Sequence, residues 1–140
     1  MFIKEIGIIG SGTMGGGIAQ LAAQKGYSVV LEDINEEYVT AGLKQIRERL
    51  EKRVTDGKIN IEEKDNILSR IRKSTKLEEL GNSDLIIEAV TENDEIKRQV
   101  FTKLDKICPK DVIFTWQGKR INIHGQDHRF KRGAGYWIGQ

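Results

Sequence analysis

Short, mostly apolar runs alternate with stretches of helical periodicity along the first 115 residues of the chain. The apolar runs predict buried strands at 6–9, 27–31, 84–90 and 112–115. Apolar residues three or four positions apart predict a helix that ends at Gly26 and further helices at 36–54, 59–70 and 93–107. Strands separated by helices are typical of an α/β fold, and we expect a doubly wound parallel sheet of the Rossmann type.

The connection after the second strand is longer than a simple crossover. The helix at 36–54 carries one apolar stripe, which consists of Val39, Leu43, Ile46, Leu50 and Val54. Asp56-Gly57 ends this helix and a second one follows at 59–70, so the sequence predicts an inserted helical hairpin. A short strand at 72–75 and one helical turn at 77–80 come next.

The composition divides the chain in two near Trp116. Residues 1–115 carry 18 Lys and Arg against 20 Asp and Glu, whereas residues 116–140 carry five against one and contain five glycines. The second part has no periodicity apart from a brief alternation at 120–123, so we expect no regular structure there. The sequence therefore predicts a folded domain at 1–115 and a basic, glycine-rich tail at 116–140.

The same composition argues against several classes of protein. A mildly acidic domain gives no reason to expect nucleic acid as a partner. The chain has no apolar run long enough to span a bilayer and no signal-peptide pattern at its start, so we expect no membrane partner. The single cysteine, Cys108, excludes an internal disulfide and fits a reducing, cytoplasmic location.

A glycine motif stands directly between the first strand and the first helix. Gly-Ser-Gly-Thr-Met-Gly at 10–15 has the form G-x-G-x-x-G, which in this context is typical of a dinucleotide-binding fold. The first glycine allows a tight turn, the second lets the backbone approach a pyrophosphate, and the third lets the helix pack on the sheet. The candidate cofactor-binding residues of this loop are Gly10, Ser11, Gly12, Thr13, Met14 and Gly15.

Asp33 stands at the end of the second strand, 23 positions after Gly10. An acid about 20 residues after the motif binds the ribose hydroxyls of NAD in such folds. A carboxylate there repels the 2′-phosphate of NADP, so the expected cofactor is NAD. The alternative is a glycine-rich turn in another α/β protein, with Asp33 as a helix cap.

Residues 1–115 resemble the nucleotide-binding domain of the NAD-dependent 3-hydroxyacyl-CoA dehydrogenases, in particular the 3-hydroxybutyryl-CoA dehydrogenases. The resemblance rests on the segment 6–20, on the hairpin after Asp33, and on Ser-Asp-Leu-Ile-Ile-Glu-Ala-Val-Thr-Glu-Asn at 83–93 followed by Lys97. It implies that Ala89 and Val90 pass the adenosine side of the cofactor and that Glu92 and Lys97 reach toward its nicotinamide half. Without the resemblance, Glu92 and Lys97 are more typical of an acid at a helix start and a solvated lysine.

The chain departs from this family after residue 115. In the family the strand at 112–115 leads into Ser-Asn-Thr-Ser-Ser and then into His-Phe-Phe-Asn-Pro, which supplies the catalytic base. Here Trp-Gln-Gly-Lys-Arg follows instead, at 116–120, and the histidine motif is absent from residues 1–140. We therefore expect a truncated Rossmann domain without the second, helical domain of the family, and we name no catalytic residue.

The tail offers no replacement chemistry. His124 and His128 have H-x-x-x-H spacing, but only Asp127 stands near as a third ligand, so no metal site is predicted. The abrupt change at Trp116 is interpreted as a shift of reading frame, because residues 135–138 read one base further resemble the family segment before its histidine. An evolved tail that mediates an interaction is the alternative.

The resemblance implies an NAD-dependent oxidoreductase of fatty acid metabolism that oxidises 3-hydroxyacyl-CoA to 3-oxoacyl-CoA. We expect the 140-residue chain to bind NAD(H) and to be catalytically incompetent alone. A non-enzymatic NAD- or nucleotide-binding interaction module is the alternative. We also expect the strand at 112–115 to present an unpaired edge, and the chain to self-associate through this edge or by exchange of tail segments between protomers.

Overall fold

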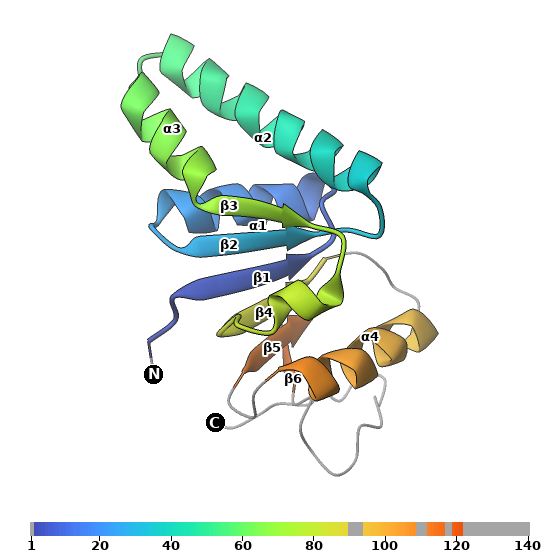
Figure 1. Cartoon of the computed structure of the whole chain (residues 1–140). Helices are drawn as coiled ribbons and strands as arrows, with labels where there is room; N and C mark the ends of the chain where they lie inside the picture. The colour runs from blue at the N-terminus through green and yellow to red at the C-terminus, as the bar shows by residue number, and fades with distance from the viewer. Residues whose placement is uncertain (1, 90–93, 109–111, 117–118, 122–140) are drawn as a thin grey trace.

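Five parallel strands and one antiparallel strand form a single sheet in the computed structural model, which describes residues 2–89, 94–108, 112–116 and 119–121 (Figure 1). The strands are β1 (Glu5–Ile9), β2 (Ser28–Glu32), β3 (Ile71–Ser74), β4 (Leu85–Glu88), β5 (Ile113–Trp116) and β6 (Lys119–Ile121), in the spatial order β3-β2-β1-β4-β5-β6. The helices are α1 (Thr13–Gln24), α2 (Glu36–Thr55), α3 (Ile61–Ser69) and α4 (Asp94–Ile107), with a 3-10 turn η1 (Leu77–Leu80) before β4. The predicted doubly wound Rossmann sheet and helical hairpin are confirmed, and the strand expected at 72–75 begins one residue earlier, at Ile71.

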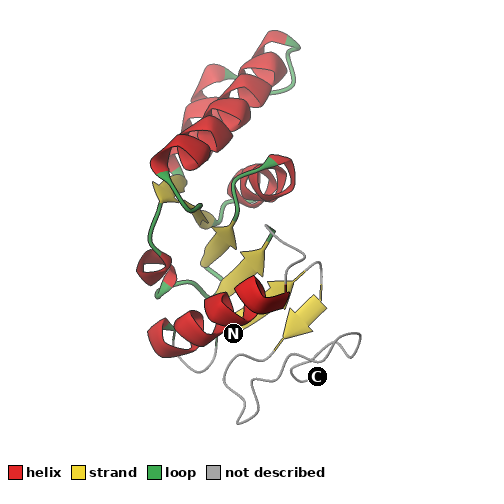
Figure 2. Ribbon diagram, turned by 90° about the vertical axis from the view of Figure 1, so that its right-hand side faces the viewer, coloured by secondary structure: helices red, strands yellow, loops and turns green. Residues whose placement is uncertain are grey.

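Helices cover both faces of the sheet, because side chains alternate between its faces along each strand. On one face α1, α2 and α3 pack over a core that includes Ile8 and Leu31. On the other face η1 and α4 cover a second core, in which the rings of Phe101 and Phe114 meet edge to face with centroids 4.6 Å apart. The α2–α3 hairpin projects beyond the β3 edge of the sheet (Figures 1 and 2).

The close fit of η1 against the sheet depends on Gly7, in the middle of β1. A Cβ atom at Gly7 would lie 2.7 Å from Ser83 Oγ and 2.8 Å from Leu80 Cδ2. Leu80 is fully buried in the second core. The turn can therefore approach β1 only because this position has no side chain.

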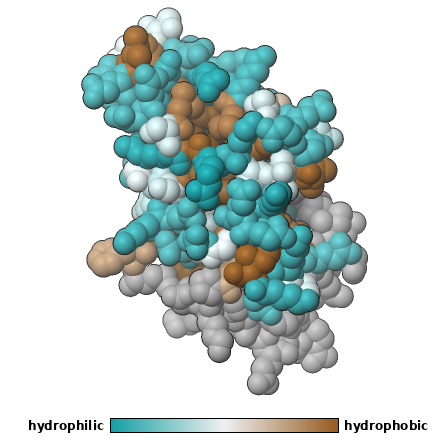
Figure 3. Space-filling model, viewed as in Figure 1, coloured by the Kyte–Doolittle hydropathy of each residue, from teal (hydrophilic) through white to brown (hydrophobic). Residues whose placement is uncertain are grey.

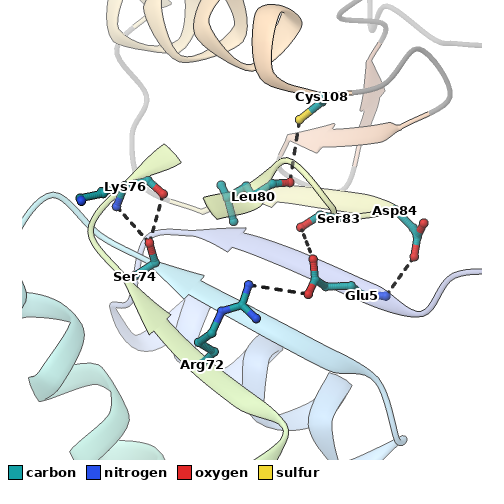
Figure 4. A network of polar contacts seen from close by, with 8 residues as sticks. All are labelled: Glu5, Arg72, Ser74, Lys76, Leu80, Ser83, Asp84 and Cys108. Carbon is teal, nitrogen blue, oxygen red and sulfur yellow. Dashed lines mark hydrogen bonds and ion pairs between the residues drawn. The ribbon is translucent and has the colours of Figure 1, made fainter. Parts of the chain in front are cut away.

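Polar contacts tie the amino ends of β1 and β4 together (Figure 4). Asp84 Oδ2 accepts hydrogen bonds from the backbone N–H groups of Glu5, at 3.0 Å, and Lys4, at 2.9 Å, and these bonds hold the pKa of Asp84 below its ordinary value. The Glu5 carboxylate accepts a bond from Ser83 Oγ at 3.5 Å and lies 3.8 Å from Arg72 Nη2. These contacts lie at the amino edge of the sheet, opposite the loops that follow the strands. They therefore stabilise the sheet without contributing to its carboxyl edge.

The expectation of an unpaired edge at 112–115 is wrong. β5 pairs in antiparallel register with β6, through Phe114 with Ile121, Thr115 with Arg120, and Trp116 with Lys119. Two residues suffice to join antiparallel strands, and Gln117-Gly118 stand between these two. Regular structure therefore extends into the segment for which we expected none, and β6 includes the first two residues of the brief alternation at 120–123. Residues 122–140, with His124 and His128, lie outside the described residues.

Two carboxylates are buried where the central strands end. Glu32 ends β2 and Glu88 ends β4, and both are in register with Ile9 at the end of β1. Only 5% of the Glu32 surface and 3% of the Glu88 surface is exposed. Burial, and after it the negative charge of Asp33, raise the pKa of Glu32 from its ordinary value of 4.5 to about 7. Near neutral pH this carboxyl group is thus held partly protonated.

The raised pKa predicts how the stability of the domain changes with pH. Because the folded state favours protonated Glu32, its contribution is fully present below pH 4.5 and is lost as the pH rises through 7. Glu32→Gln removes this loss, and above pH 7 we expect it to raise the free energy of unfolding by about 2–3 kcal/mol relative to wild type. Urea denaturation at pH 5, 6, 7 and 8 measures the difference. Glu51→Gln, at an exposed position, is the control. If the free energies of unfolding of Glu32→Gln and wild type change with pH in parallel, Glu32 does not have a raised pKa in the folded state.

Candidate cofactor site

A cleft of about 390 Å³ opens at the carboxyl edge of the sheet, beside the point where the strand order reverses between β1 and β4. The helix after β1 covers one face of the sheet and the helix after β4 covers the other, and ligands bind at such a switch point in doubly wound folds. The cleft lies between the glycine loop, the turn after β2, Ala89 after β4, and one side of α2. Its lining residues are Gly10, Ser11, Gly12, Asp33, Ile34, Tyr38, Ala41, Gly42, Gln45 and Ala89.

The three glycines of the motif have separate structural roles. Gly10 has a positive φ of 104°, and its N–H donates to the carbonyl of Glu32 at 2.7 Å, which joins the turn to β2. A Cβ atom at Gly15 would lie 1.8 Å from the carbonyl oxygen of Gly10, so α1 packs directly on the turn. A Cβ atom at Gly12 would meet no atom within 4 Å. The backbone conformation therefore requires Gly10 and the packing of α1 requires Gly15, whereas Gly12 faces open space.

The first turn of α1 is left free of a side-chain cap. Gly12 is the N-cap residue of α1 and makes no side-chain cap hydrogen bond, and no acid stands in the first turn of the helix. In contrast, Asn35 caps α2 by accepting from the N–H of Tyr38, and Asn60 caps α3 by accepting from the N–H of Glu63, each at 2.8 Å. The uncapped amides and the positive end of the α1 dipole suit an anionic ligand.

Three hydrogen bonds orient the Asp33 carboxylate. Oδ2 accepts from the N–H of Ser11 at 2.8 Å and from Ser11 Oγ at 2.6 Å, and Oδ1 accepts from the N–H of Ile34 at 2.7 Å. The carboxylate lines the cleft and is partly exposed there. Since Asn35 is the N-cap residue of α2, Asp33 does not have the role of a helix cap that the sequence left open.

Gly42 belongs to the site and was missed by the sequence analysis. A Cβ atom at Gly42 would lie 2.5 Å from the carbonyl oxygen of Ser11 and 2.8 Å from its Cβ atom. The lack of a side chain lets α2 pack against the glycine loop and close one side of the cleft. The available signal was an isolated glycine inside a strong helical pattern, which commonly has a packing reason.

The remaining predicted residues are only partly accounted for. Thr13 and Met14 form the first turn of α1, and Met14 is exposed. Ala89 lines the cleft, and its N–H donates to the carbonyl of Ile9 at 2.9 Å. Val90 and Glu92 lie outside the described residues. Lys97 belongs to α4, but its side chain is not among those described.

The part of the chain that the structure describes lacks the marks of a metal centre and of a membrane-spanning helix. It contains no group of three His, Cys, Asp or Glu side chains placed to hold a metal ion. None of its helices combines the length and apolar character needed to cross a bilayer.

The residues present fit a dinucleotide. Open space over Gly12 and uncapped amides at the start of α1 suit a pyrophosphate, and the Asp33 carboxylate suits a pair of ribose hydroxyls. Ile34 and Tyr38, 75% and 52% exposed, line the same cleft as Asp33 and offer apolar surface there. The arrangement contains donors for phosphate, an acceptor for a diol, and a surface for a ring.

Comparisons with known proteins identify the family of the chain. The sequence matches the family described as "3-hydroxyacyl-CoA dehydrogenase, NAD binding domain" over residues 5–132. It is 39% identical over 121 residues to 3-hydroxyadipyl-CoA dehydrogenase of Escherichia coli, a match that covers 86% of this chain and 26% of that protein. It is 42% identical over 113 residues to the probable 3-hydroxybutyryl-CoA dehydrogenase of Bacillus subtilis, covering 81% of this chain and 39% of that protein.

Solved structures show the same similarity. The crystal structure of (S)-3-hydroxybutyryl-CoA dehydrogenase from Ralstonia eutropha superposes with a TM-score of 0.79 at 36% identity, covering 82% of this chain and 41% of that one. The chain thus spans less than half the length of these relatives. The match over residues 5–132 shows that the chain belongs to the NAD-binding domain family of the 3-hydroxyacyl-CoA dehydrogenases.

Proposed function

We propose that this chain supplies the NAD-binding part of an oxidoreductase that converts 3-hydroxyacyl-CoA to 3-oxoacyl-CoA, with an acyl-CoA as the substrate of the complete enzyme. The observation that carries the proposal is the open position at Gly12, beside an uncapped helix start and an oriented acid. Family membership supplies the class of reaction, and the described residues supply the cofactor side of it.

The proposed roles follow from the chemistry of each group. The backbone amides of the glycine loop and of Thr13 and Met14 hold the pyrophosphate, and Asp33 accepts hydrogen bonds from the adenine ribose. Ala89 and Val90 pass the adenosine side, and Glu92 and Lys97 reach the nicotinamide half. These last roles are supported by the resemblance of 83–97 to the family.

Bound NAD accepts a hydride from the carbon that bears the substrate hydroxyl. The proton of that hydroxyl needs a positioned base. No residue of the chain matches the family's histidine motif, so we propose that residues 1–140 hold the cofactor without turning over substrate.

Two further properties are part of the proposal. The single cysteine supports a reducing compartment such as the cytoplasm. Because β6 pairs with β5, an unpaired β5 edge does not support self-association. The proposal of self-association is supported instead by exposed apolar side chains such as Leu21 and Ile61, which are 55% and 63% exposed. Figure 3 shows apolar patches separated by a largely hydrophilic surface on one side of the molecule.

Cofactor preference tests the role of Asp33. A carboxylate beside the ribose repels a 2′-phosphate by about 1–3 kcal/mol, so we expect the chain to bind NAD at least tenfold more tightly than NADP. Asp33→Ala should weaken NAD binding and reduce the preference to less than about threefold. Calorimetric titration with both cofactors measures the ratio. Asp56→Ala, at the far end of α2, is the matched control, and equal affinity of wild type for both cofactors would remove the assignment.

A pair of glycine substitutions separates cofactor binding from folding. Gly12 has a φ of −69° and open space at its Cβ position, so Gly12→Ala should change the free energy of unfolding by less than about 1 kcal/mol. The added methyl group occupies the phosphate position, and we expect NAD affinity to fall at least tenfold, about 1.4 kcal/mol.

The matched control is Gly17→Ala, also with no atom within 4 Å of the added methyl group but inside α1. It should stabilise the helix by about 0.5–1 kcal/mol and leave NAD binding intact. Fluorescence titration with NADH and urea denaturation provide the two measurements. A Gly12→Ala variant that binds like wild type would exclude this loop as the phosphate site.

The absence of turnover is tested with the purified chain. At saturating NAD and 3-hydroxybutyryl-CoA we expect the absorbance of NADH not to rise above background during an incubation of hours. Robust turnover would show that another residue of the chain supplies the base.

A further inference from the structure

The Ser11 hydroxyl lies between two acceptors, and it can serve only one of them at a time. Its Oγ atom is 2.6 Å from Asp33 Oδ2 and 3.0 Å from the carbonyl oxygen of Tyr38. A serine hydroxyl has a single hydrogen to donate. Because the distance to Asp33 is shorter and the carboxylate is charged, the hydroxyl donates its hydrogen bond to Asp33 in the ligand-free protein.

Asp33 has little acceptor capacity to spare in this state. A carboxylate offers about four lone-pair positions. The N–H and the hydroxyl of Ser11 occupy Oδ2, and the N–H of Ile34 occupies one position on Oδ1. About one position is therefore left for a ligand, whereas an adenine ribose presents two adjacent hydroxyls.

The carbonyl of Tyr38 is the other acceptor, and it can accept from Ser11 without loss of a hydrogen bond within α2. Its carbonyl oxygen has two lone pairs, so it can accept from Ser11 beside a helical N–H. Ser11 is only 4% exposed. Because Gly42 has no side chain, the backbone of Ser11 packs directly against α2. The N–H bond to Asp33 holds the backbone of Ser11, so the change requires only a rotation of the hydroxyl hydrogen and a small movement of Oγ.

We propose that the Ser11 hydroxyl is an exchangeable placeholder for one ribose hydroxyl. In the free protein it donates to Asp33. When NAD binds, it donates to the carbonyl of Tyr38 and releases a second acceptor position on Asp33 for the ribose. This inference rests on the proposed function, since it needs a ligand with a ribose diol in the cleft. Ser11 is thus a positioning residue that acts through Asp33.

The placeholder sets how much a single ribose hydroxyl contributes to affinity. In the wild-type protein the second hydroxyl replaces a hydrogen bond that Asp33 already had, so its net contribution is small. In Ser11→Ala the same acceptor position is empty before binding, and the second hydroxyl then makes an additional charge-assisted bond. A serine that merely fixes the acid predicts the opposite, because its loss would loosen Asp33 and make both hydroxyls matter less.

The experiment compares NAD with analogues that lack the 2′- or the 3′-hydroxyl of the adenosine ribose. For wild type we expect loss of either single hydroxyl to weaken binding by less than about threefold, and for Ser11→Ala by about five- to tenfold. In Asp33→Ala the analogues should bind as NAD does. Ser69→Ala, at the exposed end of α3 where Oγ donates to the Asn66 carbonyl at 2.7 Å, is the matched control and should behave as wild type.

The outcomes separate this inference from the proposed function. If wild type does not bind NAD, the proposed function fails. If NAD binds in an Asp33-dependent way but the hydroxyl effect is unchanged or smaller in Ser11→Ala, the placeholder is overturned and the proposed function stands. Thermal unfolding checks that the variants fold, and Ser11→Gly, which also lacks the hydroxyl, provides the second variant on which the same increase is expected.

Discussion

The close approach of three backbone segments around the end of β1 is the constraint on which the site depends. The carbonyl of Gly10 lies where a side chain on Gly15 would begin, and Ser11 lies where a side chain on Gly42 would begin. These contacts direct the amino end of α1 at the cleft and press α2 against the glycine loop. Because backbone atoms on both sides are fixed by helices and strands, the neighbours cannot yield to an added methyl group. The shape of the cleft is thus decided by missing side chains.

Acidic side chains stand at the carboxyl edge of the sheet, although the pyrophosphate of NAD, which is an anion, binds at this edge in such folds. Glu32 and Asp33 stand at the end of β2 and Glu88 at the end of β4, the two strands that flank β1. Burial keeps Glu32 partly protonated near neutral pH, and three donors compensate the charge of Asp33. The α1 dipole then contributes about 0.3–1 kcal/mol in favour of an anion, and direct bonds from its free amides contribute more. The local donors at the loop outweigh the more distant acids.

The two halves of the sheet have different tasks. From the half with β2 and β3, the turn after β2 contributes Asp33 and Ile34 to the cleft, and α2 forms one of its sides. The half with β4, β5 and α4 forms the second core and presents Ala89 to the same cleft. β1 joins them, because Ile8 faces one core and Ile9 the other. The antiparallel β6 then covers the edge of β5. The site therefore draws on one half more than on the other.

Local patterns in the sequence determined the order of strands and helices along the chain, the inserted hairpin, the glycine loop and the position of Asp33 at the end of β2. Each of these depends on residues close together in the chain, where apolar period, glycine and helix caps act directly. Contacts across long separations were decided only by tertiary structure. Gly42 became part of the site because α2 packs on Ser11, and Asp33 acquired its orientation from a residue 22 positions earlier. The pairing of β6 with β5 likewise depends on a partner strand, which the composition of a basic, glycine-rich segment does not reveal.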